Sequence, residues 1–406
     1  MSQSPPDQLP RLRLKKERLR RVLSGHPWVF SNELQSVPEL PPGTIVAVEA
    51  PGGEPLGIGY YNPRTLIAVR WLRRGAGELP EDWVERRVDA AVARREALYP
   101  GESCVRLIYG EADGLPGFVA DRYGDALVLQ VSTAGAEALR ARVEAALQES
   151  AGPRVQVRKD DSPLRELEGL PKRVECVPSG ADPVQRVTHQ GLELEVPLSE
   201  GQKTGLFLDQ RENVKAFLAR LASGARILDA FCYLGVWGLA ALKAGAAEAE
   251  FVDDSRAACE RVESALTLNG LPDCEIHHGD AFDVLPALRR AGKSYEAVVC
   301  DPPAFAKSKK HLPEAEKAYR RLNELAVSLV KPGGLLVTCS CSYHLQREAF
   351  REIVAAAVAR SRRDGVLLEA TDFWSRVKAD QELAAVRLQE IQEKQQRLRQ
   401  TEAANP

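Results

Sequence analysis

From about residue 200 onward, short apolar runs of strand length alternate with stretches that have helical periodicity. The apolar runs are ARILDAF, AEAEFVDDS, CEIHHGDAF, YEAVVCDPP and GGLLVTCSCS. A repeated strand-helix order predicts a doubly wound parallel sheet, in which ligands bind beyond the carboxyl ends of the strands. We therefore expect an α/β domain in residues 199–370 with its functional residues at the strand ends.

The first half of the chain has a different pattern. Residues 11–75 hold the runs TIVAVEA, PLGIGYY and LIAVRWL between Pro-Gly turns, which predicts a compact β-barrel in residues 1–76. The pattern then changes to helix, strand, turn, strand and helix, and GLELEVPL alternates strictly, so residues 77–198 are expected to form a central α+β domain. Residues 371–406 are polar and rich in Gln, Glu and Arg, which predicts an atypical helical or disordered tail.

Composition excludes several classes of protein. The 406 residues are 44% hydrophobic and 28% charged, as in ordinary soluble domains, and no run approaches the roughly 18 apolar residues of a membrane span. The charged N-terminal stretch is followed by no apolar segment, so it is not expected to be a signal peptide. We therefore expect no membrane partner.

The cysteines indicate a reducing compartment. They form no CxxC pair and have no nearby histidine ligands, so we expect a cytoplasmic protein with neither a disulfide framework nor a metal site. The eight positions are 104, 176, 232, 259, 274, 300, 339 and 341.

Charge is unevenly distributed although the net charge is only −2. The segment RLRLKKERLRR, residues 11–21, holds seven Lys or Arg against one Glu. It is either a solvated face or a patch that contacts nucleic-acid phosphates, and the pattern alone leaves both open.

Four aspartates are predicted to close successive strands of the α/β domain, namely Asp229, Asp253, Asp280 and Asp301. A phosphate site would need N–H groups and cations instead, so the acids favour a ligand that carries positive charge. No GxGxxG follows the first strand, which argues against a dinucleotide. Asp253 is placed to accept hydrogen bonds from ribose hydroxyls, and Asp280 to accept one from an adenine amino group with Phe282 as a stacking face. The set indicates S-adenosylmethionine, whose sulfonium is cationic.

Several long motifs occur in the order found in a known family. They are SGHPWVF, GEADGLPGFVADRYGD, GQKTGLFLDQREN, LDAFCYLGVWGLAAL, CDPPAFAKSKK and TCSCS. Over residues 10–350 the chain resembles the class I S-adenosylmethionine-dependent 23S rRNA (cytosine-C5)-methyltransferases that carry an N-terminal PUA domain. The resemblance implies a PUA-like RNA-binding barrel, a central EEHEE-type domain and a Rossmann-like methyltransferase domain. It also implies a ribosomal RNA partner, with 23S rRNA as the expected substrate, and leaves a homodimer open.

The resemblance extends the set of expected cofactor-binding residues, because the stretch that matches Lys203 to Asn213 packs against the cofactor in this family. The whole expected set is Phe207, Asp209, Gln210, Arg211, Asp229, Tyr233, Gly235, Asp253, Asp280, Phe282, Asp301 and Pro302.

The segment CDPPAFAKSKK suits the chemistry of cytosine methylation. Carbon 5 of cytosine becomes a nucleophile only after a thiolate adds at carbon 6, and an acid near N3 assists that addition. Asp301 suits the acid, because Pro302 and Pro303 hold its corner rigid.

Two cysteines could supply the thiolate. Cys341 lies just past the predicted strand GGLLVTCS, which is expected to lie beside the strand that ends at Asp301, and a small buried strand residue is its alternative interpretation. Cys339 alternates with Cys341 on the same face of the sheet and is the rival candidate. The resemblance places Cys341 on the motif cysteine of the family, whereas the position after the two prolines, which carries a second cysteine in some relatives, is Ala304 here. Cys300 is expected to be a core residue.

The lysines after the double proline are open to two interpretations. Lys307, Lys309, Lys310 and His311 form either a cationic loop at the mouth of the site or a solvated helix start.

Past residue 365 the family pattern, which ends in a hydrophobic strand, is lost, so the last strand of the sheet is expected to be missing. Two other functions remain open: a guanine N-methyltransferase of ribosomal RNA, which has no need of Cys341, and a non-catalytic RNA-binding assembly factor.

Overall fold

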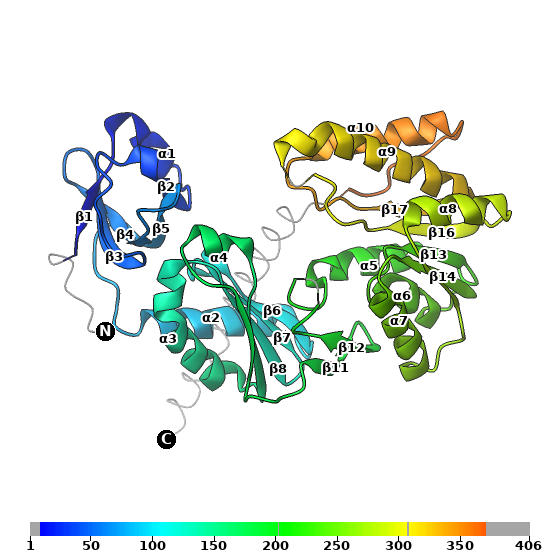
Figure 1. Cartoon of the computed structure of the whole chain (residues 1–406), viewed down its shortest axis with the longest axis horizontal. Coiled ribbons are helices and arrows are strands. Elements are labelled where there is room, and N and C mark those ends of the chain that lie inside the picture. The colour runs from blue at the N-terminus through cyan, green and yellow to red at the C-terminus, as the bar shows by residue number, and fades with distance from the viewer. Residues whose placement is uncertain (1–8, 202, 307, 371–406) are drawn as a thin grey trace, which may run out of the picture. The chain divides into compact units, whose positions relative to one another are not determined.

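The computed structural model describes residues 9–201, 203–306 and 308–370, which form two compact units. The first unit contains the described residues up to Gln185 together with Pro197–Gly205. The second contains Arg186–Val196 and the described residues from Leu206 onward. The expected tail, residues 371–406, lies outside the described residues. Figure 1 labels the elements of both units.

The first part of unit one is a five-stranded sheet, as the short apolar runs predict. The strands are ordered β1-β3-β4-β5-β2, with β1 parallel to β3 and the other pairs antiparallel. The inward side chains Val29, Val46 and Val69 are fully buried, because strict alternation sends every second residue to the core. The elements are β1 (Arg11–Arg13), η2 (Lys16–Arg18), α1 (Leu19–Leu23), β2 (Trp28–Phe30), η3 (Ser31–Glu33), β3 (Thr44–Glu49), β4 (Pro55–Tyr61) and β5 (Ile67–Arg74).

The second part of unit one is a mixed sheet covered by two helices. The strand order is β10-β9-β8-β7-β6, and α2 and α3 pack their apolar residues against β6, β7 and β8 in one core. The order of helix, strands and helix is the one that the sequence predicts. The elements are α2 (Trp83–Leu98), β6 (Cys104–Tyr109), η4 (Gly110–Asp113), β7 (Phe118–Tyr123), β8 (Ala126–Val131), α3 (Ala134–Ala151), β9 (Val155–Asp160), α4 (Pro163–Leu167) and β10 (Arg173–Val177).

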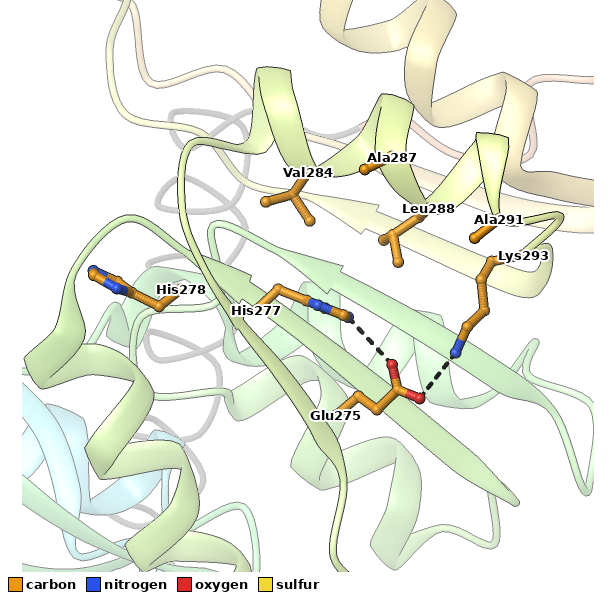
Figure 2. Close-up of a pocket in the computed structure, with 8 residues that line it drawn as sticks. All are labelled: Glu275, His277, His278, Val284, Ala287, Leu288, Ala291 and Lys293. Atoms are coloured by element: carbon orange, nitrogen blue, oxygen red, sulfur yellow. Dashed lines mark hydrogen bonds and ion pairs between the residues drawn. The ribbon is translucent and has the colours of Figure 1, made fainter.

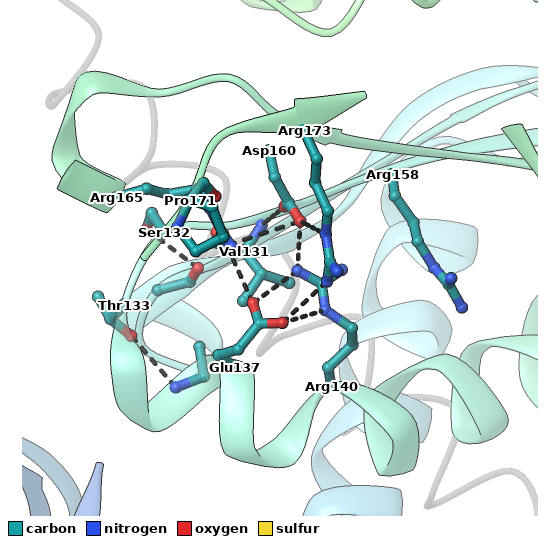
Figure 3. Close-up of polar contacts among 12 residues, drawn as sticks. Val131, Ser132, Thr133, Glu137, Arg140, Arg158, Asp160, Arg165, Pro171 and Arg173 are labelled. Atoms are coloured by element: carbon teal, nitrogen blue, oxygen red, sulfur yellow. Dashed lines mark hydrogen bonds and ion pairs between the residues drawn. The ribbon is translucent and has the colours of Figure 1, made fainter. Parts of the chain in front are cut away.

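A buried network of charges holds α3, α4, β9 and β10 together (Figure 3). Asp160 accepts hydrogen bonds from Arg140 and Arg173, and Glu137 accepts from the same two arginines and from Arg165. Burial alone would raise the pKa of Glu137, but hydrogen bonds from Arg140 and Arg165 outweigh it and lower that pKa to about 2. Because each acid has arginine partners, we assign the network a structural role and no catalytic one.

Polar side-chain pairs also join the two parts of unit one. Glu111 accepts hydrogen bonds of 2.7 Å from Trp28 Nε1 and from Arg70, and Asn62 donates to Glu168 at 2.7 Å. Glu111, the first carboxylate of the GEADGLPG segment, is therefore an ion-pair partner of Arg70.

Unit two contains a five-stranded sheet in which every pair of neighbours is parallel. Its order is β15-β14-β13-β16-β17, which confirms the predicted doubly wound sheet. Helices α6 and α7 cover one face, and α8, α9 and α10 cover the other (Figure 1). The elements of this part of the chain are β11 (Val184–His189), β12 (Leu192–Pro197), η5 (Leu208–Gln210), α5 (Arg211–Leu218), β13 (Arg226–Ala230), α6 (Val236–Lys243), β14 (Glu248–Asp253), α7 (Arg256–Leu268), β15 (Glu275–His278), α8 (Ala281–Arg290), β16 (Tyr295–Cys300), η6 (Lys309–His311), α9 (Leu312–Leu329), β17 (Val330–Thr338) and α10 (Arg347–Arg360).

The last strand differs from its predicted bounds. Strand β17 begins at Val330, with a register shift against β16, and it ends at Thr338, before both cysteines of TCSCS. In the described residues β17 is an edge of the sheet, and the apolar side chains at positions 366–368 are exposed. No helix in the described part of the chain is long and apolar enough to cross a membrane.

Candidate active site

The four predicted strand-end acids all lie toward the carboxyl edge of the parallel sheet, although only two of them stand where the pattern places them. Asp253 is the last residue of β14, and Asp301 directly follows β16. Asp229 is instead the penultimate residue of β13 and fully buried, and Asp280 lies two residues past the end of β15. The apolar run marks a strand, but the hydrogen bonds to its neighbours decide where that strand ends.

The loop that follows β13 has an unusual backbone. Phe231 and Tyr233 adopt left-handed φ angles of 61° and 51°, and Gly235 one of 68°. Such angles are rare for residues with a side chain and cluster at functional sites. Gly238, the other glycine of this motif, is needed for packing, because a Cβ there would lie 2.4 Å from the Phe251 ring.

Asp253 fixes this loop to the next strand. Its Oδ2 accepts a hydrogen bond from the Tyr233 N–H and its Oδ1 one from the Ser255 N–H, both at 2.9 Å. Each carboxylate oxygen has two lone pairs, so both oxygens can still accept from a ligand hydroxyl.

Asp229 is the buried acid of the site. Its Oδ2 accepts from the Gly238 N–H at 2.9 Å, whereas its Oδ1 is buried and has no hydrogen-bond partner among the described residues. Burial raises the pKa of Asp229 well above its usual value, and the negative charges of Asp301 and Asp253 raise it further. Three mutually repelling acids at one sheet edge fit a cationic ligand such as a sulfonium or an ammonium group.

Asp280 and Phe282 begin α8 beside this edge. Asp280 Oδ1 caps the helix by accepting from the Phe282 N–H at 2.8 Å. The half-buried Phe282 ring lies 5.9 Å from the Phe305 ring, and the Arg321 guanidinium lies 5.2 Å from its centroid. Their expected contacts with adenine remain predictions.

The segment that follows Leu206 reaches the same edge. The rings of Phe207 and Tyr233 meet edge to face at 5.6 Å, and Gln210 Nε2 donates to Asp301 Oδ2 at 3.2 Å. Asp209 is exposed in η5, and Arg211 is buried at the start of α5. The structure therefore brings two of the four motif residues, Phe207 and Gln210, into contact with the strand-end loops, a contact that periodicity alone could not reveal.

The two cysteines of TCSCS have different surroundings. The Cys339 N–H donates to the Cys300 carbonyl at 2.9 Å, and burial together with the charge of Asp301 raises the pKa of the Cys339 thiol well above its usual value. Cys341 is exposed, and its Sγ lies 3.6 Å from the Pro302 carbonyl oxygen. Cys300 is fully buried, which confirms its interpretation as a core residue. Only Cys341 combines an accessible thiol with a place against the double-proline corner.

A buried pair of hydroxyl groups joins the segment that carries Cys341 to the segment that follows the double proline. Ser342 Oγ accepts from the Ala306 N–H at 3.1 Å and lies 2.9 Å from the Tyr319 hydroxyl, and both side chains are buried. The Phe305 ring packs on Tyr319 at 4.6 Å. Sequence analysis missed this clamp, because Tyr319 appears in the sequence as one more apolar position of an amphipathic helix.

Loss of the Tyr319 hydroxyl should loosen this clamp. We expect Tyr319→Phe to reduce the free energy of unfolding by about 1 kcal/mol, since one hydrogen bond is lost while the ring remains. The rate of the methyl transfer that the sequence predicts should fall about tenfold, the effect of roughly 1.4 kcal/mol on the barrier, with unchanged cofactor affinity. Tyr295→Phe, which removes a buried hydroxyl at the start of β16, is the matched control, and an equal loss of activity in both variants would contradict a positioning role.

A separate polar cluster lies along edge strand β15 (Figure 2). The Lys293 ammonium is 2.8 Å from Glu250 and 3.1 Å from Glu275, and His277 Nε2 is 3.0 Å from Glu250 and 3.7 Å from Glu275. Figure 2 shows the two contacts that Glu275 makes with Lys293 and His277. The cluster borders a hollow of about 560 Å³ whose other wall is the apolar side of α8. Possible metal ligands of Glu250, Glu275 and His277 lie within 4.8 Å of one another, but the ammonium already holds the position between the two carboxylates. We assign the cluster to an ion-pair network.

Comparisons with known proteins show which families the two parts of the chain match. Residues 12–74 match the family described as a PUA-like domain, and residues 174–363 match the S-adenosylmethionine-dependent methyltransferases. S-adenosylmethionine is therefore the cofactor, as the acids at the strand ends predict. Ribosomal RNA large subunit methyltransferase I of Shewanella denitrificans is 38% identical over 370 residues, which cover 88% of this chain and 92% of the relative. The protein of that name from Photobacterium profundum is 36% identical over 365 residues, which cover 88% and 91%.

Solved structures confirm the fold. An S-adenosylmethionine-dependent methyltransferase from Streptococcus mutans superposes with a TM-score of 0.74 at 18% identity, and the match covers 89% of this chain and 93% of that one. A methyltransferase in complex with SAH gives a TM-score of 0.75 at 18% identity over the same shares of the two chains. The predicted combination of a PUA-like domain with a Rossmann-like methyltransferase domain is thus correct.

Proposed function

This chain belongs to the family of ribosomal RNA large subunit methyltransferase I, and we propose that it methylates carbon 5 of a cytosine in 23S ribosomal RNA. The observation that carries the proposal is the exposed Cys341 thiol, whose Sγ lies 3.6 Å from the Pro302 carbonyl oxygen, next to Asp301. A guanine N-methyltransferase has no use for a thiol at this place, so the cysteine favours cytosine.

The proposed reaction begins with the target cytosine between Cys341 and Asp301. The Cys341 thiolate forms a bond to carbon 6 while Asp301 donates a proton toward N3, which leaves carbon 5 electron-rich. S-adenosylmethionine, held by the acids at the strand ends, would supply the electrophilic methyl group that carbon 5 accepts. Solvent water then accepts the proton on carbon 5 and the N3 proton returns to Asp301, so that the carbon–sulfur bond to Cys341 breaks, the thiolate leaves and the aromatic ring is restored. The Gln210 amide donates to Asp301 Oδ2 and so orients the Asp301 carboxyl group for proton donation.

The cofactor would lie across the carboxyl edge of β13, β14 and β16. Asp229 and Asp301 would face its positive charge, and Asp253 the ribose hydroxyls, where both of its oxygens have spare lone pairs. Asp280 and Phe282 would contact the adenine. The remaining proposed contacts are Phe207, Asp209, Gln210, Arg211, Tyr233, Gly235 and Pro302.

Removal of the Asp253 carboxylate should weaken cofactor binding. We expect Asp253→Ala to cost about 1 to 3 kcal/mol of S-adenosylmethionine affinity, because charge-assisted hydrogen bonds to the ribose are lost. Isothermal titration calorimetry measures this directly. The neighbouring exposed acid gives a matched control, since Asp254→Ala makes the same change of charge without removing the proposed contact. Equal affinities of the two variants for S-adenosylmethionine would show that Asp253 does not contact the cofactor.

The barrel sheet of unit one would supply part of the RNA contact. In the basic run, Arg11 and Arg13 each donate to Glu49 at 3.0 Å, whereas Lys16, Arg18 and Arg20 are exposed. The last three are therefore the cations best placed to contact phosphates. A homodimer remains a prediction that this arrangement does not address.

Mass analysis of ribosomal RNA nucleosides tests the proposed function. RNA from a strain that lacks this gene should lose one 5-methylcytidine, and the purified enzyme with S-adenosylmethionine should restore it. Loss of an N-methylguanosine instead would replace the cytosine assignment, and loss of no methylated nucleoside would favour an assembly factor.

A further inference from the structure

An exposed aromatic side chain follows the proposed nucleophile. The Tyr343 side chain is 84% exposed, which equals the largest exposure among the large apolar side chains of the described residues, that of Val366. The His344 ring meets the Tyr343 ring edge to face at 5.3 Å and 78°. Because Tyr343 is so exposed, its ring remains available to a further planar group.

The backbone on both sides of Tyr343 is anchored. Ser342 is buried through its bonds to Ala306 and Tyr319, and Leu345 is buried in a cluster that also includes Tyr319. Two residues span at most about 7 Å, so Tyr343 lies close to Cys341. The buried side chains of Ser342 and Leu345 thus anchor the backbone that carries the exposed ring, two residues from Cys341.

Cations lie on the neighbouring segment. Lys309, Lys310 and His311 form η6 and are all exposed, and the next residue, Leu312, packs against the cluster that contains Leu345. One apolar cluster therefore supports both the segment with the exposed ring and the segment with the positive charges. An exposed aromatic ring near exposed positive charges suits a chain of alternating bases and phosphates.

We propose that Tyr343 stacks against the base next to the target nucleotide in single-stranded RNA, while Lys309 and Lys310 contact the flanking phosphates. The inference rests on the proposed function, since the target base is taken to lie at Cys341. A base that reacts at the enzyme must leave its own stack, and an aromatic platform for its neighbour holds the strand in an open conformation. Stacking tolerates any base, because every base has a π-face.

Fluorescence anisotropy with a labelled octamer of oligocytidylate tests the proposal. Tyr343→Ala should weaken binding about tenfold at each salt concentration, whereas Tyr343→Trp should bind as the wild type does. The double variant Lys309→Ala with Lys310→Ala should lower the slope of log affinity against log salt by about 1.4, since each phosphate contact on a single strand contributes about 0.7. Val366→Ala, which truncates an equally exposed side chain, should change nothing.

Two outcomes overturn the proposal. Wild-type affinity in Tyr343→Ala, as expected if the ring serves a ribosomal protein instead, removes the stacking role. An equal loss in Tyr343→Ala and Tyr343→Trp shows that aromatic character is not what matters. S-adenosylmethionine affinity, measured on each variant, confirms that the methyltransferase domain is folded. Since the octamer assay makes no use of the methylated product, it can fail while 5-methylcytidine is still formed, and it can succeed if the product proves to be another nucleoside.

Discussion

Replacement of Cys341 with alanine is expected to reduce methyl transfer by on the order of 10³-fold or more, because carbon 5 of cytosine has no route to nucleophilic character without the adduct at carbon 6. The thiol is exposed, so its removal should change the free energy of unfolding by less than about 0.5 kcal/mol. Cofactor affinity should be unchanged. Single-turnover kinetics on ribosomal RNA with calorimetry of S-adenosylmethionine binding separates these effects.

Cys339→Ala is the matched control for this experiment. Burial and the charge of Asp301 raise the pKa of the Cys339 thiol, so it remains protonated at neutral pH and is a poor nucleophile. The variant should keep most of its activity. Near wild-type methylation by Cys341→Ala would rule out the covalent route, and the guanine-N assignment would then take its place.

Replacement of Asp301 with asparagine is the second change with a large expected effect. The amide keeps the shape of the side chain and an oxygen that can accept from Gln210, but it cannot donate an acidic proton toward N3. General acid catalysis typically contributes about 10²- to 10⁴-fold, so we expect a loss in kcat of that order. S-adenosylmethionine affinity should fall by less than the rate does, because several other groups bind the cofactor.

Gln210→Ala serves as the comparison for Asp301. It removes the hydrogen bond that orients the acid but leaves the acid itself, so its loss of kcat should be smaller than that of Asp301→Asn. An Asp301→Asn enzyme whose kcat matches that of the wild type would exclude proton donation by this residue.

The architecture of unit two follows from its sequence because strands buried on both faces appear as short apolar runs between amphipathic helices. The adjacency of β16 and β17, predicted from their order, is confirmed by the register that places Cys300 beside Thr338. The bounds of the strands were less predictable. Nothing in CEIHHGDAF or GGLLVTCSCS shows where pairing with a neighbour stops, so Asp280 and Cys339 lie beyond their strands, whereas Cys341 lies past its strand as predicted.

The residues of the candidate site were predictable where they lie at the end of a strand, as Asp253 and Asp301 do. The contact of Gln210 with Asp301 joins positions 91 apart, and the pair of Tyr319 and Ser342 depends on how α9 packs, so neither leaves a local signal in the chain. Cys339 and Cys341 likewise differ in burial. Residues that alternate on one face of a strand look alike in the sequence, so this difference could not be predicted.

Covalent trapping tests the central claim most directly. In RNA that carries 5-fluorocytidine, the methylated adduct cannot lose a proton from carbon 5, so the thiolate stays bonded to carbon 6. With S-adenosylmethionine present, the wild-type enzyme and Cys339→Ala should form a protein–RNA complex that survives denaturing electrophoresis, and peptide mass mapping should place the adduct on Cys341. Cys341→Ala should form none. A wild-type enzyme that methylates unmodified RNA but forms no such complex with the fluorinated RNA, or an adduct at a residue other than Cys341, would contradict the account.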